Sequence, residues 1–393
     1  MTAFVRRQWS DLQGWDGADH AAALSAFRAS AARLEQGSFP TGSLGIDAEA
    51  FAEAAYAALK PAGALGQAEA RAFFERHFEP LHIRPDDADT ARPGFVTGYY
   101  EPVVAGSPVR TERYRFPLYA PPPDLVKIDD VSRPPGLDPY FRFARRKPCG
   151  LLEEYADRAA IEAGALDGMG LEIAWLADPV DAFFIHIQGS ARLAYEDGRQ
   201  VRVGYAAKTG HRFTAIGRIL VDEGELTLAE ADMDGIRAWL AAHPDRVRSL
   251  FDRNRSFIFF RETPVEDPEL GPVGAAKVPL TPLASIAVDR ELATFGVPYF
   301  IAAPDLAMDG VPFRRLMVAQ DTGSAILGPA RADIFVGSGD AAGRIAGRIR
   351  HAADFTILVP PARAARRARG SAVDAGADVA DDGPPARPPR LAR

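Results

Sequence analysis

The chain has 393 residues, of which 47% are hydrophobic and 25% are charged, and its net charge is −7. This length and composition predict a globular protein of about two domains with a large core. Because basic residues do not gather in the part of the chain expected to fold, nucleic acid is not expected as a partner. A polyanionic substrate would depend on local arginines, which the total charge does not exclude.

The N-terminal part of the chain, up to about residue 80, predicts helices. Asp19 precedes an apolar-rich helical segment over 20–27 and is suited to cap its N-terminus. Asp47 stands in the same relation to a second helix over 48–59. A third helix is expected over 68–78, and its phenylalanines recur on one side, as is typical of a face buried in the core.

The pattern changes to strands at Gly94. The segment 95–104 is rich in β-forming residues, and Pro102 favours an edge or a bulge there. The proline-rich segment 117–123 is expected to be a connector where the chain crosses between domains. The apolar run 182–189 predicts a strand.

Further along, strands and helices alternate and then give way to short strands. A strand is expected over 200–206, and helices are expected over 214–222, 228–241 and 244–252. Short strands with Gly/Pro turns, which suggest a small barrel, are expected over 256–261, 285–288, 299–302, 316–319, 334–336 and 355–359. After Pro360 the composition collapses into Ala, Arg, Gly, Pro and Asp, which predicts a disordered tail.

Two aspartates in this strand-rich part are the leading candidates for catalysis. Asp321 ends one expected strand, and Asp333 begins the next. If the two strands pair as an antiparallel hairpin, both carboxylates lie at the same end of the ladder. Asp289 adds a third carboxylate in the same region. The alternative is that Asp321 and Asp333 are loop residues that cap turns.

Two neighbouring carboxyl groups would suit the cleavage of a glycan, which needs a proton donor beside the scissile oxygen. An aspartic acid in water has a pKa of about 3.9, so a donor at neutral pH needs a pKa raised by burial or by a nearby carboxylate. One aspartate of a pair can stay ionised and hold its partner protonated.

Other kinds of site are poorly supported. The chain has no GxSxG or HExxH motif, and its seven histidines lack metal-ligand spacing, so no metal or other cofactor is expected. His186 is expected to pack within a strand rather than to catalyse, and the single Cys149 is expected to be a partly buried structural thiol. The side chains suited to contact a sugar are those of Tyr99, Tyr100, Gln188 and Tyr205, although each alone is more often structural.

Six segments, in this order along the chain, resemble the MltA family, the membrane-bound lytic murein transglycosylases A. They are 97–102 (TGYYEP), 183–190 (FFIHIQGS), 204–211 (GYAAKTGH) with 216–218 (IGR), 254–260 (NRSFIFF), 278–281 (VPLT) with 288–290 (VDR), and 319–326 (AQDTGSAI). The last two belong to what resembles the 3D module, named for three aspartates, which are here Asp289, Asp321 and Asp333. The resemblance covers roughly residues 10–360.

The resemblance implies a mainly β fold with N-terminal helices, in which a second β-rich domain is inserted into a double-psi β-barrel domain. The N-terminal helices and the first part of the barrel domain would occupy 1–120, and the inserted glycan-binding domain would occupy 121–256. The rest of the barrel domain, with the catalytic site, would occupy 257–360, followed by the disordered tail at 361–393. The glycan would lie in the groove between the domains.

The resemblance also implies a lytic reaction: cleavage of the β-1,4 bond between N-acetylmuramic acid and N-acetylglucosamine, which leaves a 1,6-anhydro-muramyl end. Neither a metal nor a water nucleophile is needed. By motif position, Asp333 would act first as acid and then as base. Asp321 would tune the charge of Asp333 or stabilise an oxocarbenium-like transition state. Asp289 would have a supporting role.

Residues of the inserted domain would supply the other wall of the groove. Beside Tyr99, Tyr100 and Gln188, the resemblance adds Gly189, Lys208, Gly210 and His211 as substrate-binding residues. Two positions depart from the family pattern: Thr209 stands where asparagine is common, and Leu327 stands where lysine is common.

Expected partners are peptidoglycan strands, bound by a monomer that could join cell-wall enzyme complexes. No run of eighteen apolar residues occurs, so no membrane-spanning helix is expected. The segment 1–9 lacks the apolar stretch of a signal peptide, which by itself favours the cytoplasm, and a lipobox is absent. The family resemblance implies instead the periplasm or the periplasmic face of the outer membrane.

Two other functions remain open at the level of sequence. One is a glycoside hydrolase that uses two carboxylates and water, which would leave a reducing muramyl end. The other is a wall-binding module without catalytic activity, since related barrels occur in expansin-like proteins that bind glycan without cleaving it.

Overall fold

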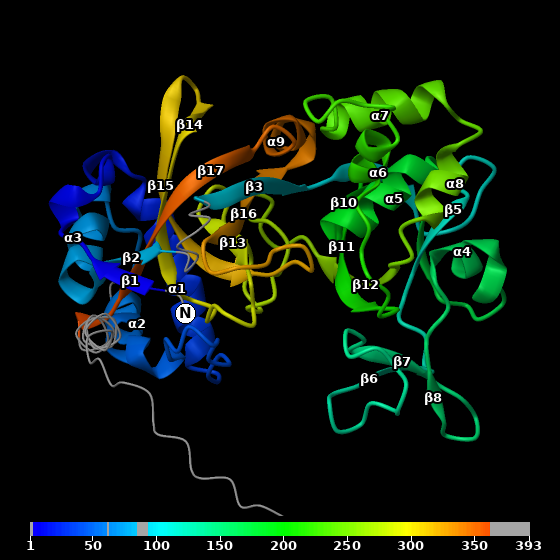
Figure 1. The fold of residues 1–393 in the computed structure, drawn as a ribbon, viewed down its shortest axis with the longest axis horizontal. Coiled ribbons are helices and arrows are strands. Elements are labelled where there is room, and N and C mark those ends of the chain that lie inside the picture. Colours follow the sequence, from blue (N-terminus) through cyan, green and yellow to red (C-terminus); the bar gives the residue numbers. More distant parts are fainter. Residues whose placement is uncertain (1–2, 61–62, 85–92, 362–393) are drawn as a thin grey trace, which may run out of the picture.

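The computed structural model describes residues 3–60, 63–84 and 93–361, whose strands form two large sheets that lie beside each other (Figure 1). One sheet closes into a barrel against which the N-terminal helices pack, and the other is open and carries its own helices. The predicted fold class, mainly β with N-terminal helices, is confirmed. The predicted tail lies outside the described residues, except for its first residue.

The N-terminal part forms the helices that the sequence predicts. They are α1 (His20–Leu34), α2 (Ala52–Leu59) and α3 (Gln67–His77), with short helical turns η1 (Trp9–Asp11), η2 (Trp15–Gly17) and η3 (Ala48–Phe51). Asp19 caps α1 as predicted, because its side chain accepts a hydrogen bond of 3.1 Å from the backbone N–H of Ala22. Phe27 of α1 packs edge-on against Phe74 and Phe78, so this aromatic face is core.

Six strands close the barrel, in the order β17, β14, β15, β13, β16, β3 and back to β17. Their bounds are β3 (Gly94–Glu101), β13 (Ser285–Val288), β14 (Pro298–Met308), β15 (Val311–Asp321), β16 (Arg331–Ser338) and β17 (Arg350–Val359). The pairs β13–β15 and β16–β3 are parallel, and the other pairs in the ring are antiparallel. Strands β1 (Ala3–Arg6) and β2 (Glu79–Arg84) extend this sheet beyond β17, and helix α9 (Gly339–Ala346) packs on β3 and β16.

The second sheet is open and has the strand order β12, β11, β10, β4, β9, β5. Its strands are β4 (Val103–Ser107), β5 (Phe116–Tyr119), β9 (Glu172–Leu176), β10 (Ser190–Tyr195), β11 (Gln200–Lys208) and β12 (Ile258–Pro264). Strands β4, β5 and β12 lie outside the limits 121–256 predicted for an inserted domain, so the six-stranded sheet reaches further along the chain than those limits, which stay a prediction.

Short elements surround the second sheet. A small three-stranded sheet consists of β6 (Leu125–Lys127), β7 (Phe143–Arg146) and β8 (Leu152–Glu153). The helices are α4 (Arg158–Ala160), the π-helical turn η4 (Ile161–Ala165), α5 (Pro179–Gln188), α6 (Ile216–Asp222), α7 (Met233–Ala242) and α8 (Val247–Asp252). In Figure 1, α5 to α8 lie together on one side of the sheet.

The prediction of a strand over 182–189 is wrong, since this segment lies in α5. Asp178 caps the helix by accepting a hydrogen bond from the N–H of Val180, and Gly189 ends it in a left-handed conformation with φ 78°. Apolar side chains of α5 are buried against both the sheet and the neighbouring helices. This two-sided burial produces an unbroken apolar run, which periodicity cannot distinguish from a buried strand.

Two smaller predictions are also corrected. The segment 117–123 is not simply a connector, because Pro117 lies within β5. Strand β5 is an edge strand that pairs with β9 alone, so the missing N–H of the proline is tolerated there. Cys149 is exposed rather than partly buried.

Candidate active site

Asp321 and Asp333 come together because both lie beside the same strand. The predicted hairpin between their strands is wrong: β15 and β16 do not pair with each other, and β13 runs between them. Ala287 of β13 is the ladder partner of Asp321 on one side and of Asp333 on the other. Neighbouring strands lie about 4.8 Å apart, so the two aspartates stand about two strand spacings apart on the barrel.

Asp333 is half-buried and has one close hydroxyl donor. Thr97 of β3, its ladder partner, donates a hydrogen bond of 2.5 Å from Oγ1 to Oδ1 of Asp333. Arg331 in turn donates from Nη2 to the same hydroxyl at 2.8 Å. Burial, with a smaller contribution from the charge of Asp321, raises the pKa of Asp333 to about 6 against the opposing effects of Thr97 and Arg331. Asp333 can therefore hold a proton close to neutral pH.

Asp321 is better supplied with donors. The Tyr99 hydroxyl donates to its Oδ2 at 2.9 Å, and the backbone N–H of Ala275 donates to its Oδ1 at 3.0 Å. Burial raises the pKa of Asp321, while these hydrogen bonds and the charge of Lys277 lower it. Asp321 therefore has more groups that favour its charged form than Asp333 has.

Tyr99 lies beside the carboxyl group of Asp321, to which its hydroxyl donates. Its ring packs on Phe335 with the ring centres 5.4 Å apart, and burial followed by the charge of Asp321 raises its pKa well above the ordinary value. The hydroxyl therefore stays protonated and remains a donor to Asp321.

Asp289 has a different kind of environment. Its carboxylate is buried and accepts hydrogen bonds from the backbone N–H groups of Glu291 at 3.1 Å and of Gly328 at 2.9 Å. Gly328 belongs to the segment 322–330 that links β15 to β16. Asp289 therefore fixes the loop between the two aspartates and has no direct contact with either of them among the hydrogen bonds of the described residues.

The predicted sugar-binding residues on and near the second sheet fall into two groups: some side chains are available to a ligand, and others are used in packing. Lys208 reaches the barrel, since its Nζ lies 3.3 Å from Oγ of Ser324, and Tyr205 exposes 42% of its surface. The side chain of Gln188 instead accepts a hydrogen bond from the backbone N–H of Tyr100. Tyr100 itself is buried against α9, so these two side chains serve packing in this conformation.

The remaining predicted contacts are buried or serve as backbone turns. His211 is buried, and its Nε2 lies 2.8 Å from the carbonyl oxygen of Tyr155. Gly210 is needed for close packing, because a Cβ there would lie 2.5 Å from the ring of Phe141. His186, expected to be a packing residue, is buried, and burial lowers its pKa well below the ordinary value.

Three residues close to the aspartates were not predicted as site residues: Thr97, Arg331 and Lys277. A signal for two of them is present in the sequence. Arg331 precedes Asp333 by two positions, and Thr97 precedes Tyr99 by two, so each pair lies on the same face of its strand. Lys277 comes from a loop, and only the tertiary structure brings it to Asp321.

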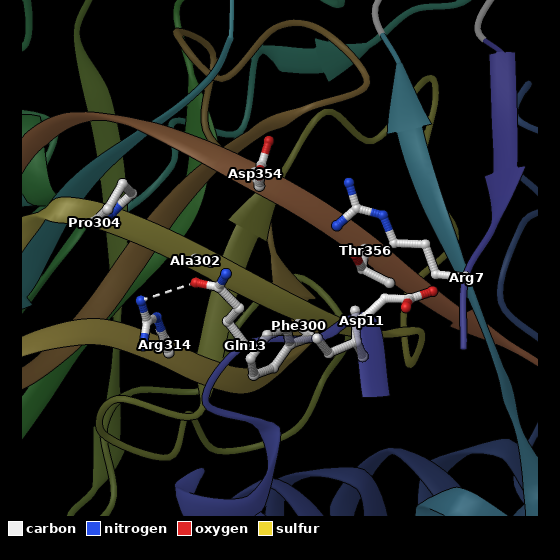
Figure 2. Close-up of a pocket in the computed structure, with 10 residues that line it drawn as sticks. Arg7, Asp11, Gln13, Phe300, Ala302, Pro304, Arg314, Asp354 and Thr356 are labelled. Carbon is white, nitrogen blue, oxygen red and sulfur yellow. Dashed lines mark hydrogen bonds between the residues drawn. The ribbon is translucent and has the colours of Figure 1, made fainter. Parts of the chain in front are cut away.

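A pocket of about 220 Å³ lies elsewhere on the barrel (Figure 2). Its lining includes Arg7, Asp11, Phe300, Arg314 and Asp354, with Arg314 donating to the side chain of Gln13 at 3.4 Å. It contains neither Asp321 nor Asp333, so it is separate from the candidate active site.

Two further observations concern the described residues as a whole. Within residues 3–60, 63–84 and 93–361, no group of three or more His, Cys, Asp or Glu side chains is placed to hold a metal ion. Across the same residues, every helix is too short or too polar to cross a bilayer.

Comparison with known proteins gives consistent matches. Residues 95–261 match the family model described as the MltA specific insert domain, and residues 284–359 match the 3D domain. A crystal structure of a membrane-bound lytic murein transglycosylase from Agrobacterium tumefaciens is 44% identical, with a TM-score of 0.86 over 93% of this chain and 99% of that one. A structure of Escherichia coli MltA with bound chitohexaose is 29% identical, with a TM-score of 0.57 over 79% of this chain and 81% of that one.

A curated relative gives the same result over a shorter span. Membrane-bound lytic murein transglycosylase A of Escherichia coli K12 is 32% identical over 269 residues, which are 67% of this chain. The match spans 64% of the length of that relative.

Proposed function

Because the chain belongs to the MltA family, we propose that it is a lytic murein transglycosylase. The proposed reaction cleaves the β-1,4 bond between N-acetylmuramic acid and N-acetylglucosamine and leaves a 1,6-anhydro-muramyl end. The observation that carries the proposal is the carboxyl group of Asp333, whose pKa burial raises to about 6, beside a second carboxyl group rich in donors.

In the proposed mechanism, Asp333 acts twice. Protonated Asp333 gives its proton to the glycosidic oxygen as the bond from this oxygen to C1 of the muramyl sugar breaks. The resulting carboxylate then takes the proton of the C6 hydroxyl while O6 bonds to C1, so Asp333 ends protonated and no water is consumed. The hydroxyl of Thr97 holds the carboxyl group in one orientation for both steps.

Asp321 would stay ionised and face the positive charge that develops at C1. Its two donors, Tyr99 and the N–H of Ala275, hold it in place and favour its charged form. Asp289 would keep the loop between β15 and β16 in position through Gly328. The glycan itself would run past Asp333 between the barrel and the second sheet, where Lys208 approaches Ser324.

The proposed place of action is the murein layer, in the periplasm or at the periplasmic face of the outer membrane, because the relatives are named membrane-bound. The relative from Escherichia coli binds chitohexaose, a β-1,4 glycan, which supports a glycan as the ligand here as well.

The proposal is tested by mass analysis of the products released from purified murein sacculi. A lytic enzyme gives 1,6-anhydro-muropeptides, whereas a hydrolase gives reducing muramyl ends, and a binding module gives binding without soluble products. Asp333→Asn should retain sacculus binding and lose about 100-fold or more of the turnover, which is the usual contribution of general acid–base catalysis. Near-normal turnover by this variant would remove Asp333 from the mechanism.

A further inference from the structure

Two neighbouring strands line up four side chains around the candidate acid. In the parallel pair of β3 and β16, Phe95 is the ladder partner of Arg331, and Thr97 is the ladder partner of Asp333. Residues two positions apart lie on the same face of a strand, so these four side chains share one face of the barrel wall. Helix α9 packs on the opposite face, against Gly98.

Hydrogen bonds link Arg331 to Asp333 through Thr97. The Nη2 of Arg331 donates to Oγ1 of Thr97 at 2.8 Å, and its Nη1 donates to the carbonyl oxygen of Ala332. The guanidinium also lies over the ring of Phe95, with its central carbon 5.5 Å from the ring centre. Within the described part of the chain, Arg331 forms no direct ion pair with Asp333 or with another carboxylate. The positive charge is therefore held one hydroxyl group away from the candidate acid.

This arrangement decides in which direction the Thr97 hydroxyl donates. An arginine side chain has donors and no acceptor, and a hydroxyl has one proton to give. The bond from Arg331 uses an acceptor site of Oγ1, and the hydroxyl proton goes to Oδ1 of Asp333 at 2.5 Å. If Asp333 donated from Oδ1 instead, the hydroxyl proton would need another acceptor, and the hydrogen bonds of the described residues give it none. The oxygen that accepts this proton is therefore not the one that carries the acid proton.

Other charged and titratable groups approach Asp333 from the neighbouring elements. The charge of Asp321, at the end of β15, raises the pKa of Asp333, and the hydroxyl of Tyr99 on β3 donates to Asp321. The ladder partner of Asp333 on β13 is Ala287, which carries no charge. The charged residues of α9 belong to a helix on the opposite face of β3. Arg331 is therefore the one cation that the hydrogen bonds of the described residues link to Asp333.

We propose that Arg331 is a positioning residue for the proposed reaction: it keeps Thr97 as a donor to Oδ1 of Asp333, so that Oδ2 carries the catalytic proton. This inference rests on the proposed function. In the first step the proton leaves Oδ2 for the glycosidic oxygen as the bond from that oxygen to C1 breaks. In the second step Oδ2 takes the proton of the C6 hydroxyl while O6 bonds to C1. One oxygen serves both steps, and the carboxyl group does not turn between them.

The test measures the pH dependence of product release from murein sacculi by Arg331→Met, by Thr97→Val and by the variant with both changes. Arg331→Met removes the charged donor and leaves the hydroxyl able to turn. Turnover should fall about tenfold, because the proton is then divided between two oxygens, and the alkaline limb of the profile should move to higher pH. In the Thr97→Val background the same change should move the limb at most about half as far, since effects that pass through one contact are not additive.

Two further variants complete the comparison. Arg331→Lys keeps the charge and can donate to Thr97, so it should restore most of the lost turnover and the natural position of the limb. Arg218→Met on α6 removes an arginine that pairs with Asp222 outside this group of contacts, and it should leave both unchanged. Equal movement of the limb with and without the Thr97 hydroxyl would overturn the inference, because Arg331 would then act by its charge alone.

A purely structural role or a substrate-binding role of Arg331 gives other results. Loss of folding lowers turnover at every pH and leaves the limb in place, which would contradict the inference. A substrate-binding role would weaken the binding of chitohexaose when Arg331→Met is added to Asp333→Asn. We expect this binding to stay the same.

The products of the unsubstituted protein separate failure of this inference from failure of the proposed function. If it releases anhydro products and Arg331→Met moves the limb alike in both backgrounds, the role of Arg331 is refuted and the function stands. If it releases no anhydro products, both are refuted.

Discussion

Burial raises the pKa of both Asp321 and Asp333. The two aspartates differ in the neighbouring groups that lower the pKa again. Asp321 accepts hydrogen bonds from Tyr99 and Ala275, and Lys277 lies near it, whereas Asp333 has only the hydroxyl of Thr97 and the more distant charge of Arg331. A single hydrogen bond can therefore change which protonation state of Asp333 dominates near neutral pH.

The first prediction concerns the pH dependence of turnover. If Asp333 must be protonated to start the reaction, the rate falls as pH rises through about 6. Thr97→Val removes the hydroxyl that favours the carboxylate, so the pKa of Asp333 should rise and the alkaline limb of the profile should move to higher pH. Thr97→Ser keeps the hydroxyl and is the control. A Thr97→Val profile that coincides with that of the unsubstituted protein would show that another group sets this limb.

The second prediction concerns stability. The pKa of Asp333 rises from 3.8 to about 6 on folding, so the folded state favours the protonated form. The contribution of Asp333 to the free energy of unfolding therefore falls as pH rises from about 4 to about 6, by about 1–3 kcal/mol. This contribution does not change further above that range. Asp333→Asn cannot ionise, so it should be more stable than the unsubstituted protein at pH 7.5 and similar to it near pH 4. Urea unfolding at both pH values measures this, and equal stability at pH 7.5 would contradict it.

At the scale of elements, the site depends on how the end of β15 meets the loop that precedes β13. The backbone of Gly274 lies so close to β15 that a Cβ there would stand 2.6 Å from the carbonyl oxygen of Gln320. The next residue, Ala275, donates to Asp321. The side chain of Gln320 points the other way and donates to the carbonyl oxygen of Ala26 in α1 at 2.7 Å, so β15 is also tied to the N-terminal helices.

The third prediction follows from this close approach. Gly274→Ala should push the loop away from β15, weaken the hydrogen bond from Ala275 to Asp321 and lower turnover about tenfold or more, because misplacement by about 1 Å is costly in catalysis. Gly17→Ala, where a Cβ would meet no atom within 4 Å, is the control and should keep normal turnover. Normal kinetics in Gly274→Ala would show that this contact does not position Asp321.

At the scale of the molecule, the two sheets are joined where β3 ends and β4 begins. Glu101, at the end of β3, is fully buried and pairs with Arg192 of β10 at 3.0 Å and with Arg202 of β11. It also accepts a hydrogen bond of 2.7 Å from the hydroxyl of Ser338 at the end of β16. One carboxylate therefore connects the barrel to the second sheet and fixes the two halves on which the proposed substrate would lie.

The fourth prediction tests this junction. Glu101→Gln leaves two buried arginines without their negative partner and should lower the free energy of unfolding by about 3–5 kcal/mol. Asp222→Asn removes an exposed ion pair with Arg218 and should leave the free energy of unfolding nearly unchanged. Chemical denaturation of both variants measures the difference. A loss below about 1 kcal/mol for Glu101→Gln would show that the ion pairs of Glu101 with Arg192 and Arg202 are not important for stability.

Parts of the fold and of the candidate site could be predicted from the sequence, because the interactions that form them are local. Asp19 caps α1 through a residue three positions away, and the barrel strands follow runs of β-forming residues. The three aspartates were found by residue type and by position in a family motif. The sequence also indicated correctly that a mainly β protein with N-terminal helices would form.

Only the tertiary structure decided how these parts meet. Strand order is set by contacts between residues far apart in sequence, so β13 could take its place between Asp321 and Asp333 without any local signal. Two-sided burial made α5 look like a strand. The pKa of Asp333 likewise depends on burial and on charges brought from separate segments, which are properties of the folded structure rather than of neighbouring residues.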